Sequence, residues 1–200
     1  MNNHPPNHRR IAAIDPGATG AIALLDRVTG QLQVWDMPLA EIDIGNGRHA
    51  RQKKATSAIG VAGILADCSP DVVWIEDVGA RPGQGVVSMF TFGRAVGTLE
   101  GVCAGLAIPV MHVRPQIWMR EFGVVGKGYK TDGSAKTPNG RKIAAEAYPE
   151  YASMFERVKD HGRADAALIA LYGAKHARGL VISKYVGERT LDPTLKENNK

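Results

Sequence analysis

Three acidic residues stand where a strand or a helix could hold a carboxylate in a fixed position. Asp15 follows the apolar residues 11–14 and directly precedes a Pro-Gly turn. Glu76 ends a second apolar run, residues 72–75, and Asp165 lies in the first turn of an expected helix. Each acid alone also has a structural explanation, because aspartate often caps turns and favours helix starts. Together the three could do chemistry that requires several carboxylates.

Such a set of acids favours hydrolysis assisted by divalent metal ions. Mg²⁺ and Mn²⁺ are hard cations that bind carboxylate oxygens and few other protein ligands. Two ions about 3.5 to 4 Å apart could activate a water, stabilise the leaving oxygen and neutralise charge at a phosphate. His161 shares a helix face with Asp165, four residues later. A lone histidine, however, is more often a hydrogen-bonded surface residue than a ligand.

Basic charge is concentrated in one part of the chain. The 200 residues contain 25 Lys and Arg against 20 Asp and Glu, a net charge of +5. Residues 114–142 alone contain seven basic and two acidic residues. This favours a polyanionic partner, so phosphodiester hydrolysis is the expected chemistry. Contacts to a nucleic-acid backbone are expected from Lys127, Lys130, Arg141 and Lys142, the alternative being a solvated charged loop.

The elements that must position these residues predict an α/β fold with a mixed sheet. Strands are expected at residues 11–15, 21–25, 31–37, 71–77 and 108–113. Helices are expected at residues 53–68, 86–106, 115–122, 137–148 and 163–178, and residues 41–51 are expected to form a loop. If the strands that end at Asp15 and Glu76 are parallel neighbours, their carboxylates converge on one edge of the sheet.

The long helix over residues 86–106 carries glycines four residues apart, at Gly93, Gly97, Gly101 and Gly105. Such a bare ridge permits close approach of another helix or strand, and this helix is a hypothetical dimer element. The aromatic residues are expected to pack in the core, and they are Trp35, Trp74, Phe90, Phe92 and Trp118.

One domain, residues 9–180, is expected between flexible tails at residues 1–8 and 181–200. Cys68 and Cys103 are isolated in apolar surroundings, which is typical of reduced core residues and predicts a cytoplasmic or organellar compartment, or the cytoplasm of a phage-infected cell. The first residues lack the apolar segment of a secretory signal, and no apolar run reaches membrane-spanning length.

Four motifs resemble, in order and spacing, those of the RuvC-type Holliday junction resolvases. They are Ile14-Asp15-Pro16-Gly17 with Gly20, then Ile75-Glu76, then Arg114-Pro115-Gln116, and finally the run from His161 to Leu168. The resemblance covers about residues 9–178. It implies an RNase H-like fold with a mixed five-stranded sheet, three strands antiparallel and two parallel, flanked by helices. It also implies Mg²⁺ or Mn²⁺, and a homodimer that nicks two opposed strands of a four-way DNA junction.

The resemblance also implies roles for individual residues. The metal-binding acids, with two ions per site, would be Asp15, Glu76 and Asp165. Many bacterial members carry another Asp three residues before the last acid, where this chain has Gly162. His161 matches members that use histidine, among them phage and organellar resolvases, so it could bind the second ion, orient the water or contact the phosphate. Lys136 is the best match to a lysine that the family carries near the site.

The resemblance further places Arg81 and Gln84, in the loop after Glu76, where they could enter the junction. Arg114 joins the expected DNA-binding residues. The predicted function is therefore a metal-dependent, structure-selective endonuclease that resolves branched DNA. The alternatives are a nuclease of this fold that processes RNA and a non-catalytic DNA-binding domain, against which the three intact acids speak. An actin-like or sugar-kinase ATPase would need a second phosphate loop and a second domain. The sequence does not reveal whether the protein has a helicase partner.

Overall fold

The computed structural model describes residues 8–44, 51–79, 83, 85–124 and 140–177. The predictions for Arg81, Gln84, Lys127, Lys130 and Lys136 lie outside these residues, as do most of the two predicted tails. Within the described part of the chain, no helix is both long enough and apolar enough to cross a membrane.

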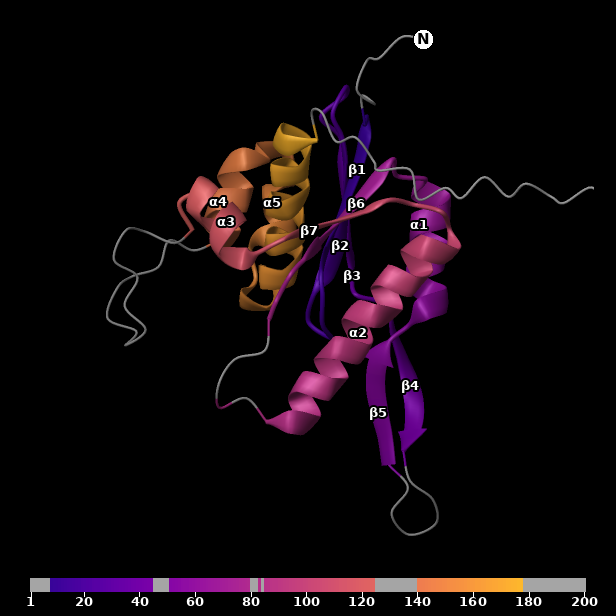
Figure 1. The fold of residues 1–200 in the computed structure, drawn as a ribbon. Coiled ribbons are helices and arrows are strands. Elements are labelled where there is room, and N and C mark those ends of the chain that lie inside the picture. Colours follow the sequence, from indigo (N-terminus) through magenta and orange to yellow (C-terminus); the bar gives the residue numbers. More distant parts are fainter. Residues whose placement is uncertain (1–7, 45–50, 80–82, 84, 125–139, 178–200) are drawn as a thin grey trace, which may run out of the picture.

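A five-stranded sheet forms the centre of the molecule (Figure 1). Its strands, in spatial order, are β3 (Leu32–Asp36), β2 (Ala21–Asp26), β1 (Arg10–Asp15), β6 (Val72–Glu76) and β7 (Val110–Val113). The first three run antiparallel to one another, β6 is parallel to β1, and β7 is parallel to β6. The predicted mixed sheet, with three antiparallel and two parallel strands, is therefore confirmed.

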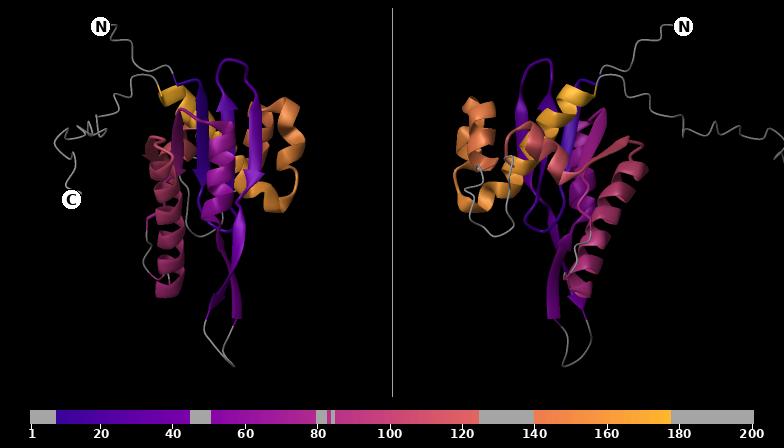
Figure 2. Two further views of the ribbon diagram at one scale, coloured as in Figure 1. Left: turned by 90° about the vertical axis from the view of Figure 1, so that its right-hand side faces the viewer. Right: turned by 60° about the vertical axis from the view of Figure 1, so that its left-hand side comes forward.

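Helices cover both faces of this sheet (Figures 1 and 2). One face packs against α5 (His161–His176), and the other packs against α1 (Ala58–Cys68) and α2 (Val86–Gly105). Alternate residues of β1 supply the two cores, with Ala13 in the first and Ile14 in the second. Because both faces are covered, β1 and β6 appear in the sequence as continuous apolar runs.

Smaller elements gather on the α5 side of the sheet. They are α3 (Pro115–Glu121), α4 (Gly140–Ala147) and two 3-10 helices, η2 (Pro149–Phe155) and η3 (Val158–Asp160). The helix α5 lies very close to the sheet, since a Cβ atom on Gly173 would come within 2.5 Å of the Trp74 ring. Glycine is therefore required where α5 crosses β6.

A hairpin replaces the loop that was expected over residues 41–51. Strands β4 (Leu39–Ile44) and β5 (Arg51–Thr56) pair antiparallel as a separate two-stranded sheet, and α1 begins only at Ala58, capped by Ser57. The prediction of a helix from residue 53 was wrong over its first turn. The hairpin lies outside the central sheet, so its strands are not buried on both faces. They therefore lack the continuous apolar pattern that identifies a buried strand, and the sequence did not predict them.

The aromatic predictions divide according to position. Trp74 and Trp118 are buried as predicted, and Trp35 and Phe92 are half-buried. Phe90, however, is 68% exposed, so its placement in the core was wrong. The reason is that only the C-terminal half of α2 packs under the sheet, through Leu99 and Cys103. The N-terminal half extends past the sheet beside β5 (Figure 1).

Candidate active site

Two of the three predicted acids lie at the ends of neighbouring parallel strands. Asp15 is the last residue of β1 and Glu76 the last of β6, and the residues before them, Ile14 and Ile75, are paired in register. The turn after Asp15 is tight, because a Cβ atom on Gly20 would lie 2.0 Å from the Asp15 carbonyl oxygen. The turn glycine and the strand register together fix both carboxylates at one edge of the sheet.

The third acid, Asp165, reaches this edge from the first turns of α5. This helix approaches the β1–β2 turn so closely that a Cβ atom on Gly162 would lie 2.3 Å from the Thr19 carbonyl oxygen. No side chain fits at position 162 without moving that turn. The contact gives a physical reason for glycine at this position.

The pKa values indicate that the three carboxyl groups are close to one another. Burial raises the pKa of Asp15 well above its usual range, and the charges of Glu76 and Asp165 raise it further. Burial also raises the pKa of Asp165 to about 6, partly offset by His161, which favours the ionised carboxylate. Burial and mutual repulsion both act against ionisation at this site, as expected where a counter-charge is supplied from outside the chain.

Glu76 is held by a residue whose role the sequence did not indicate. Glu76 is 7% exposed and accepts a 2.9 Å hydrogen bond at Oε1 from Nε1 of the fully buried Trp118. Trp118 was expected to be a packing residue only. A buried indole N–H needs an acceptor, which was a usable signal, but only the packing of α3 beside β6 identifies Glu76 as that acceptor.

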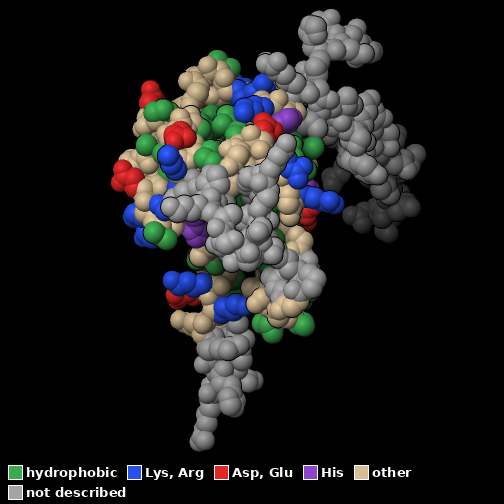
Figure 3. All heavy atoms as spheres, turned by 90° about the vertical axis from the view of Figure 1, so that its left-hand side faces the viewer, with side chains coloured by type: hydrophobic (Ala, Val, Ile, Leu, Met, Phe, Trp, Pro, Cys, Tyr) green, Lys and Arg blue, Asp and Glu red, His purple; other side chains and the backbone are tan. Residues whose placement is uncertain are grey.

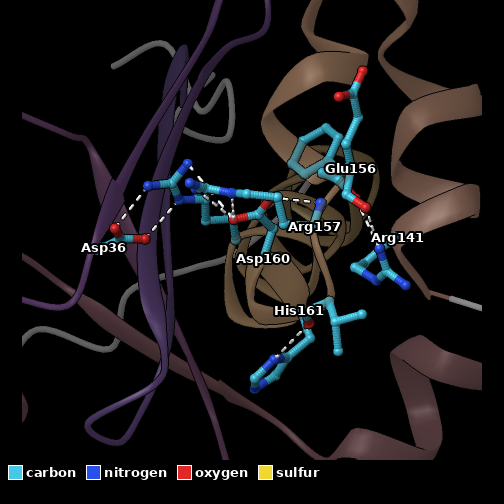
Figure 4. Close-up of polar contacts among 9 residues, drawn as sticks. Asp36, Arg141, Glu156, Arg157, Asp160 and His161 are labelled. Carbon is cyan, nitrogen blue, oxygen red and sulfur yellow. Dashed lines mark hydrogen bonds and ion pairs between the residues drawn. The ribbon is translucent and has the colours of Figure 1, made fainter.

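His161 lies near this group of acids without being enclosed by it. Its ring is exposed, and Nδ1 lies 3.4 Å from the Val158 carbonyl oxygen (Figure 4). The ring therefore has one nitrogen near the backbone and the other directed toward neither Asp160 nor Arg157 (Figure 4).

The donor set fits a hard divalent cation. Among the described residues, no group of three His, Cys, Asp or Glu side chains is arranged so that it could hold a metal on its own. Mg²⁺ usually keeps several waters and binds through one or two carboxylates together with substrate phosphates. Converging carboxylates that do not form a closed cage therefore suit a metal shared with a phosphate.

The described residues that were predicted to bind DNA differ in the exposure of their side chains and in the contacts that these side chains make. Arg114 is exposed, with Nε 3.8 Å from Asp77 Oδ2, and Lys142 is exposed beside Glu146. Arg141 Nη1 donates to the Glu156 carbonyl oxygen at 2.6 Å and so helps to hold the end of η2 (Figure 4). On the face that carries α3 and α4, basic and acidic side chains are interspersed (Figure 3).

Comparisons with known proteins show what the chain is similar to. No family model matches the chain. The chain is 26% identical over 182 residues to the chloroplastic Holliday junction resolvase MOC1 of Chlamydomonas reinhardtii, an alignment that covers 82% of this chain. The chain spans only about a fifth of that relative's length, since the alignment covers 20% of it.

Two solved structures share the fold. Thermus thermophilus RuvC in complex with Holliday junction substrate matches 86% of this chain and 96% of its own, with a TM-score of 0.52 and 16% identity. The yeast mitochondrial Holliday junction resolvase Ydc2 matches 88% of this chain and 81% of its own, with a TM-score of 0.51 and 14% identity. The chain therefore has the fold of these two Holliday junction resolvases and is similar in sequence to a third.

Proposed function

We propose that this chain is a divalent-metal-dependent endonuclease that resolves four-way DNA junctions by hydrolysing one phosphodiester per subunit. The observation that carries the proposal is the meeting of Asp15, Glu76 and Asp165 at one edge of the sheet. Within the described ranges, neither Asp15 nor Asp165 forms an ion pair with a lysine or arginine. Half-buried acids without a basic partner are unfavourable for folding, which favours a functional reason for keeping them.

The proposed metal ligands are Asp15, Glu76 and Asp165, with two Mg²⁺ or Mn²⁺ ions and His161 at the margin of the site. When bound, such ions activate water and neutralise the charge that develops at the phosphate. The chain's own contribution is positioning. The β1–β2 turn fixes Asp15, Trp118 holds Glu76, and the close approach of α5 delivers Asp165.

DNA contacts are proposed for the basic residues beyond the acids. Arg114 and Lys142 have the freer side chains, whereas Arg141 already donates to backbone carbonyl groups. We therefore expect Lys142 to contribute more than Arg141 to binding of the DNA phosphate backbone. Lys136, Lys127, Lys130, Arg81 and Gln84 stay predictions from the sequence.

A homodimer formed through α2 is also proposed. The N-terminal half of this helix exposes Val86, Val87 and Phe90, at 80%, 73% and 68%. Along the same helix, a Cβ atom at Gly97 would meet nothing within 4 Å, so nothing in the described part of this chain explains the glycine. A second copy that packs against this ridge would explain both features.

The Gly97→Ala variant distinguishes a dimer that forms through α2 from a monomer in which α2 has no partner. If α2 is unpartnered, alanine should stabilise the chain by about 0.5 to 1 kcal/mol, because glycine is a poor helix former. If α2 packs against a second copy, the added methyl group should weaken dimerisation. Sedimentation velocity over a range of concentrations measures this, and a monomer at all concentrations would contradict the proposal.

A reducing compartment, cytoplasmic or organellar, is proposed from the cysteines. Cys68 and Cys103 are both free and buried. Burial raises the pKa of Cys103 to about 11, which keeps the thiol protonated and unreactive. These are the properties of structural thiols, not of a disulfide framework.

The function is tested by incubating the purified chain with a synthetic four-way junction in the presence of Mg²⁺, Mn²⁺ or EDTA. Linear duplex DNA and an RNA–DNA hybrid serve as substrate controls. Paired nicks in opposed strands, dependent on metal and confined to the junction, are expected. Equal cutting of the linear duplex would overturn junction selectivity, and preferred cutting of the hybrid would favour an RNA-processing enzyme.

A further inference from the structure

A groove of about 430 Å³ lies between the β4–β5 hairpin and the N-terminal half of α2. Its lining includes Gly17 and Ala18, which follow Asp15 in the β1–β2 turn, together with Lys53 and Arg94. From this groove we infer a second DNA-binding surface, which holds the phosphate backbone of the strand that continues away from the acids. The inference rests on the proposed nuclease function and adds a site on the hairpin to it.

The charge of the groove favours a polyanion. Its described lining residues include Lys53, Lys54 and Arg94, and none of these described residues is acidic. In the described part of the chain, neither Lys53 nor Arg94 forms an ion pair. Lys53 Nζ donates a 2.8 Å hydrogen bond to Thr91 Oγ1 of α2, which leaves two of its three protons for a ligand. Uncompensated cations beside hydroxyl groups are typical of contacts to phosphate.

The hairpin has two chemically different faces. In the strand register, Ile42 pairs with Lys53 on the half-buried face, whereas Glu41 pairs with Lys54 on the exposed face. Asp43 is exposed like Glu41, two residues along the same strand, and so shares its face. Neither Glu41 nor Asp43 is among the described residues that line the groove, whereas Lys53 and Lys54 both are. A polyanion that approaches the hairpin is directed to the groove.

The position of the groove identifies nucleic acid as its occupant. Because Gly17 and Ala18 line it, the groove begins two residues beyond the carboxylate of Asp15. A strand with one phosphate at the acids can continue directly into it. Phe92 adds apolar surface to the walls, which suits contact with sugars and bases. A free nucleotide would not require this continuity with the acids.

The decisive measurement is the salt dependence of junction binding, followed by fluorescence anisotropy in EDTA with the full chain. The Lys53→Met/Arg94→Gln double variant should lower the slope of log Kd against log salt concentration by about 2, and weaken binding about tenfold per residue near 0.1 M salt. Arg27→Gln removes one positive charge and is the matched control for each single variant, Lys53→Met and Arg94→Gln, since Arg27 follows β2 at the end of the sheet farthest from Asp15. An unchanged slope in the double variant, or an equal loss in Arg27→Gln, overturns the inference.

A second variant tests whether Lys53 merely attaches the hairpin to α2. Thr91→Val removes the acceptor of the Lys53 hydrogen bond but keeps the positive charge. The inference predicts that the slope is retained. A slope lowered as far as in the double variant would mean that Lys53 acts by attaching the hairpin to α2 and not by binding phosphate. Metal-dependent junction cleavage by the wild-type chain tests the proposed function separately. If cleavage is observed but the salt slope of the double variant is unchanged, only the inference about the groove is refuted.

Discussion

Asp160 and Asp165 lie five residues apart at the start of α5, and their surroundings are opposite. Asp160 is 2% exposed and accepts hydrogen bonds from Arg157, including Nη2 at 2.8 Å, with Arg163 Nη1 at 3.9 Å (Figure 4). Hydrogen bonding from Arg157 holds the pKa of Asp160 below its usual range. Burial raises the pKa of Asp165 to about 6. The start of α5 thus carries one acid whose charge is compensated by arginines, Asp160, and one that has no such partner among the described residues, Asp165.

The difference separates acids that hold the fold together from acids for which we propose a role in metal binding. The compensated group extends to β3, because Arg163 also pairs with Asp36 through two hydrogen bonds of 2.6 and 2.7 Å. These pairs attach α5 to the sheet. Neither Asp15 nor Asp165 has such an ion pair in the described ranges, and the charges of Glu76 and Asp165 raise the pKa of Asp15. A site of this kind is expected where an external cation completes the charge balance.

The largest expected effect is on catalysis. Asp15→Asn keeps the size of the side chain but removes a ligand charge, so junction cleavage should fall about 1,000-fold or more, equivalent to about 4 kcal/mol. Cleavage rates at saturating enzyme measure the effect, and circular dichroism verifies the fold. An Asp15→Asn variant with nearly full activity would contradict the assignment of this edge as the active site.

The next effect is on stability and depends on pH. The folded-state pKa of Asp165, about 6, lies above its ordinary value of 3.8, so the folded chain binds this proton more tightly than the unfolded chain. Stability is therefore lost as the pH rises from about 4 through about 6. Asp165→Asn should remove this loss and be more stable than wild type by about 2 kcal/mol above pH 7, with little difference below pH 4.

Asp36→Asn is the matched control, and urea unfolding at several pH values gives the comparison. Hydrogen bonding from Arg163 lowers the pKa of Asp36, so its stabilising contribution is present above the unfolded pKa and lost as the pH falls through the folded one. Asp36→Asn should therefore lower stability at neutral pH. If both variants shifted stability in the same direction, the contrast between the two groups of acids would be wrong.

A smaller loss of stability is expected from Asp160→Asn. The change weakens the hydrogen bonds from the Arg157 side chain and from its backbone N–H, which lies 2.8 Å from Oδ2. The expected cost is about 1 to 2 kcal/mol in the free energy of unfolding. Junction cleavage at a temperature where the variant is folded should stay near wild type. A loss as severe as that of Asp15→Asn would move Asp160 into the catalytic group.

The smallest effect concerns the residue that positions Glu76. Trp118→Phe keeps most of the packing and removes the indole N–H that Glu76 accepts. Cleavage should fall about tenfold, or about 1.4 kcal/mol, with a higher metal concentration needed for half-maximal rate. A raised metal requirement separates positioning from packing, and an unchanged metal requirement with reduced stability would leave Trp118 a packing residue.

The sheet and its acids could be predicted because local sequence determines them. Continuous apolar runs identify β1 and β6, and each run ends in the acid that the strand delivers. The meander and the long helix α2 follow from turn residues and helical spacing in the same way. These features depend on burial and turn chemistry, which the chain encodes within a few residues.

Other features depend on contacts between distant residues. The β4–β5 hairpin lies outside the central core, and its strands contain charged residues such as Glu41, Lys53 and Lys54. The strands therefore lack the apolar pattern from which a buried strand is predicted. The partner of the Trp118 indole lies 42 residues away. Phe90 has a typical core side chain, but it is exposed because its end of α2 passes beyond the sheet. None of these properties can be seen in a local stretch of sequence.

The central claim is that the uncompensated acids bind a divalent cation, and Mn²⁺ titration followed by electron paramagnetic resonance tests it most directly. The wild-type chain and Asp160→Asn should bind Mn²⁺ saturably at neutral pH, and binding should weaken as the pH falls below about 6, where Asp165 becomes protonated. Asp15→Asn should lose that binding. Equal Mn²⁺ binding by wild type and Asp15→Asn would contradict the account.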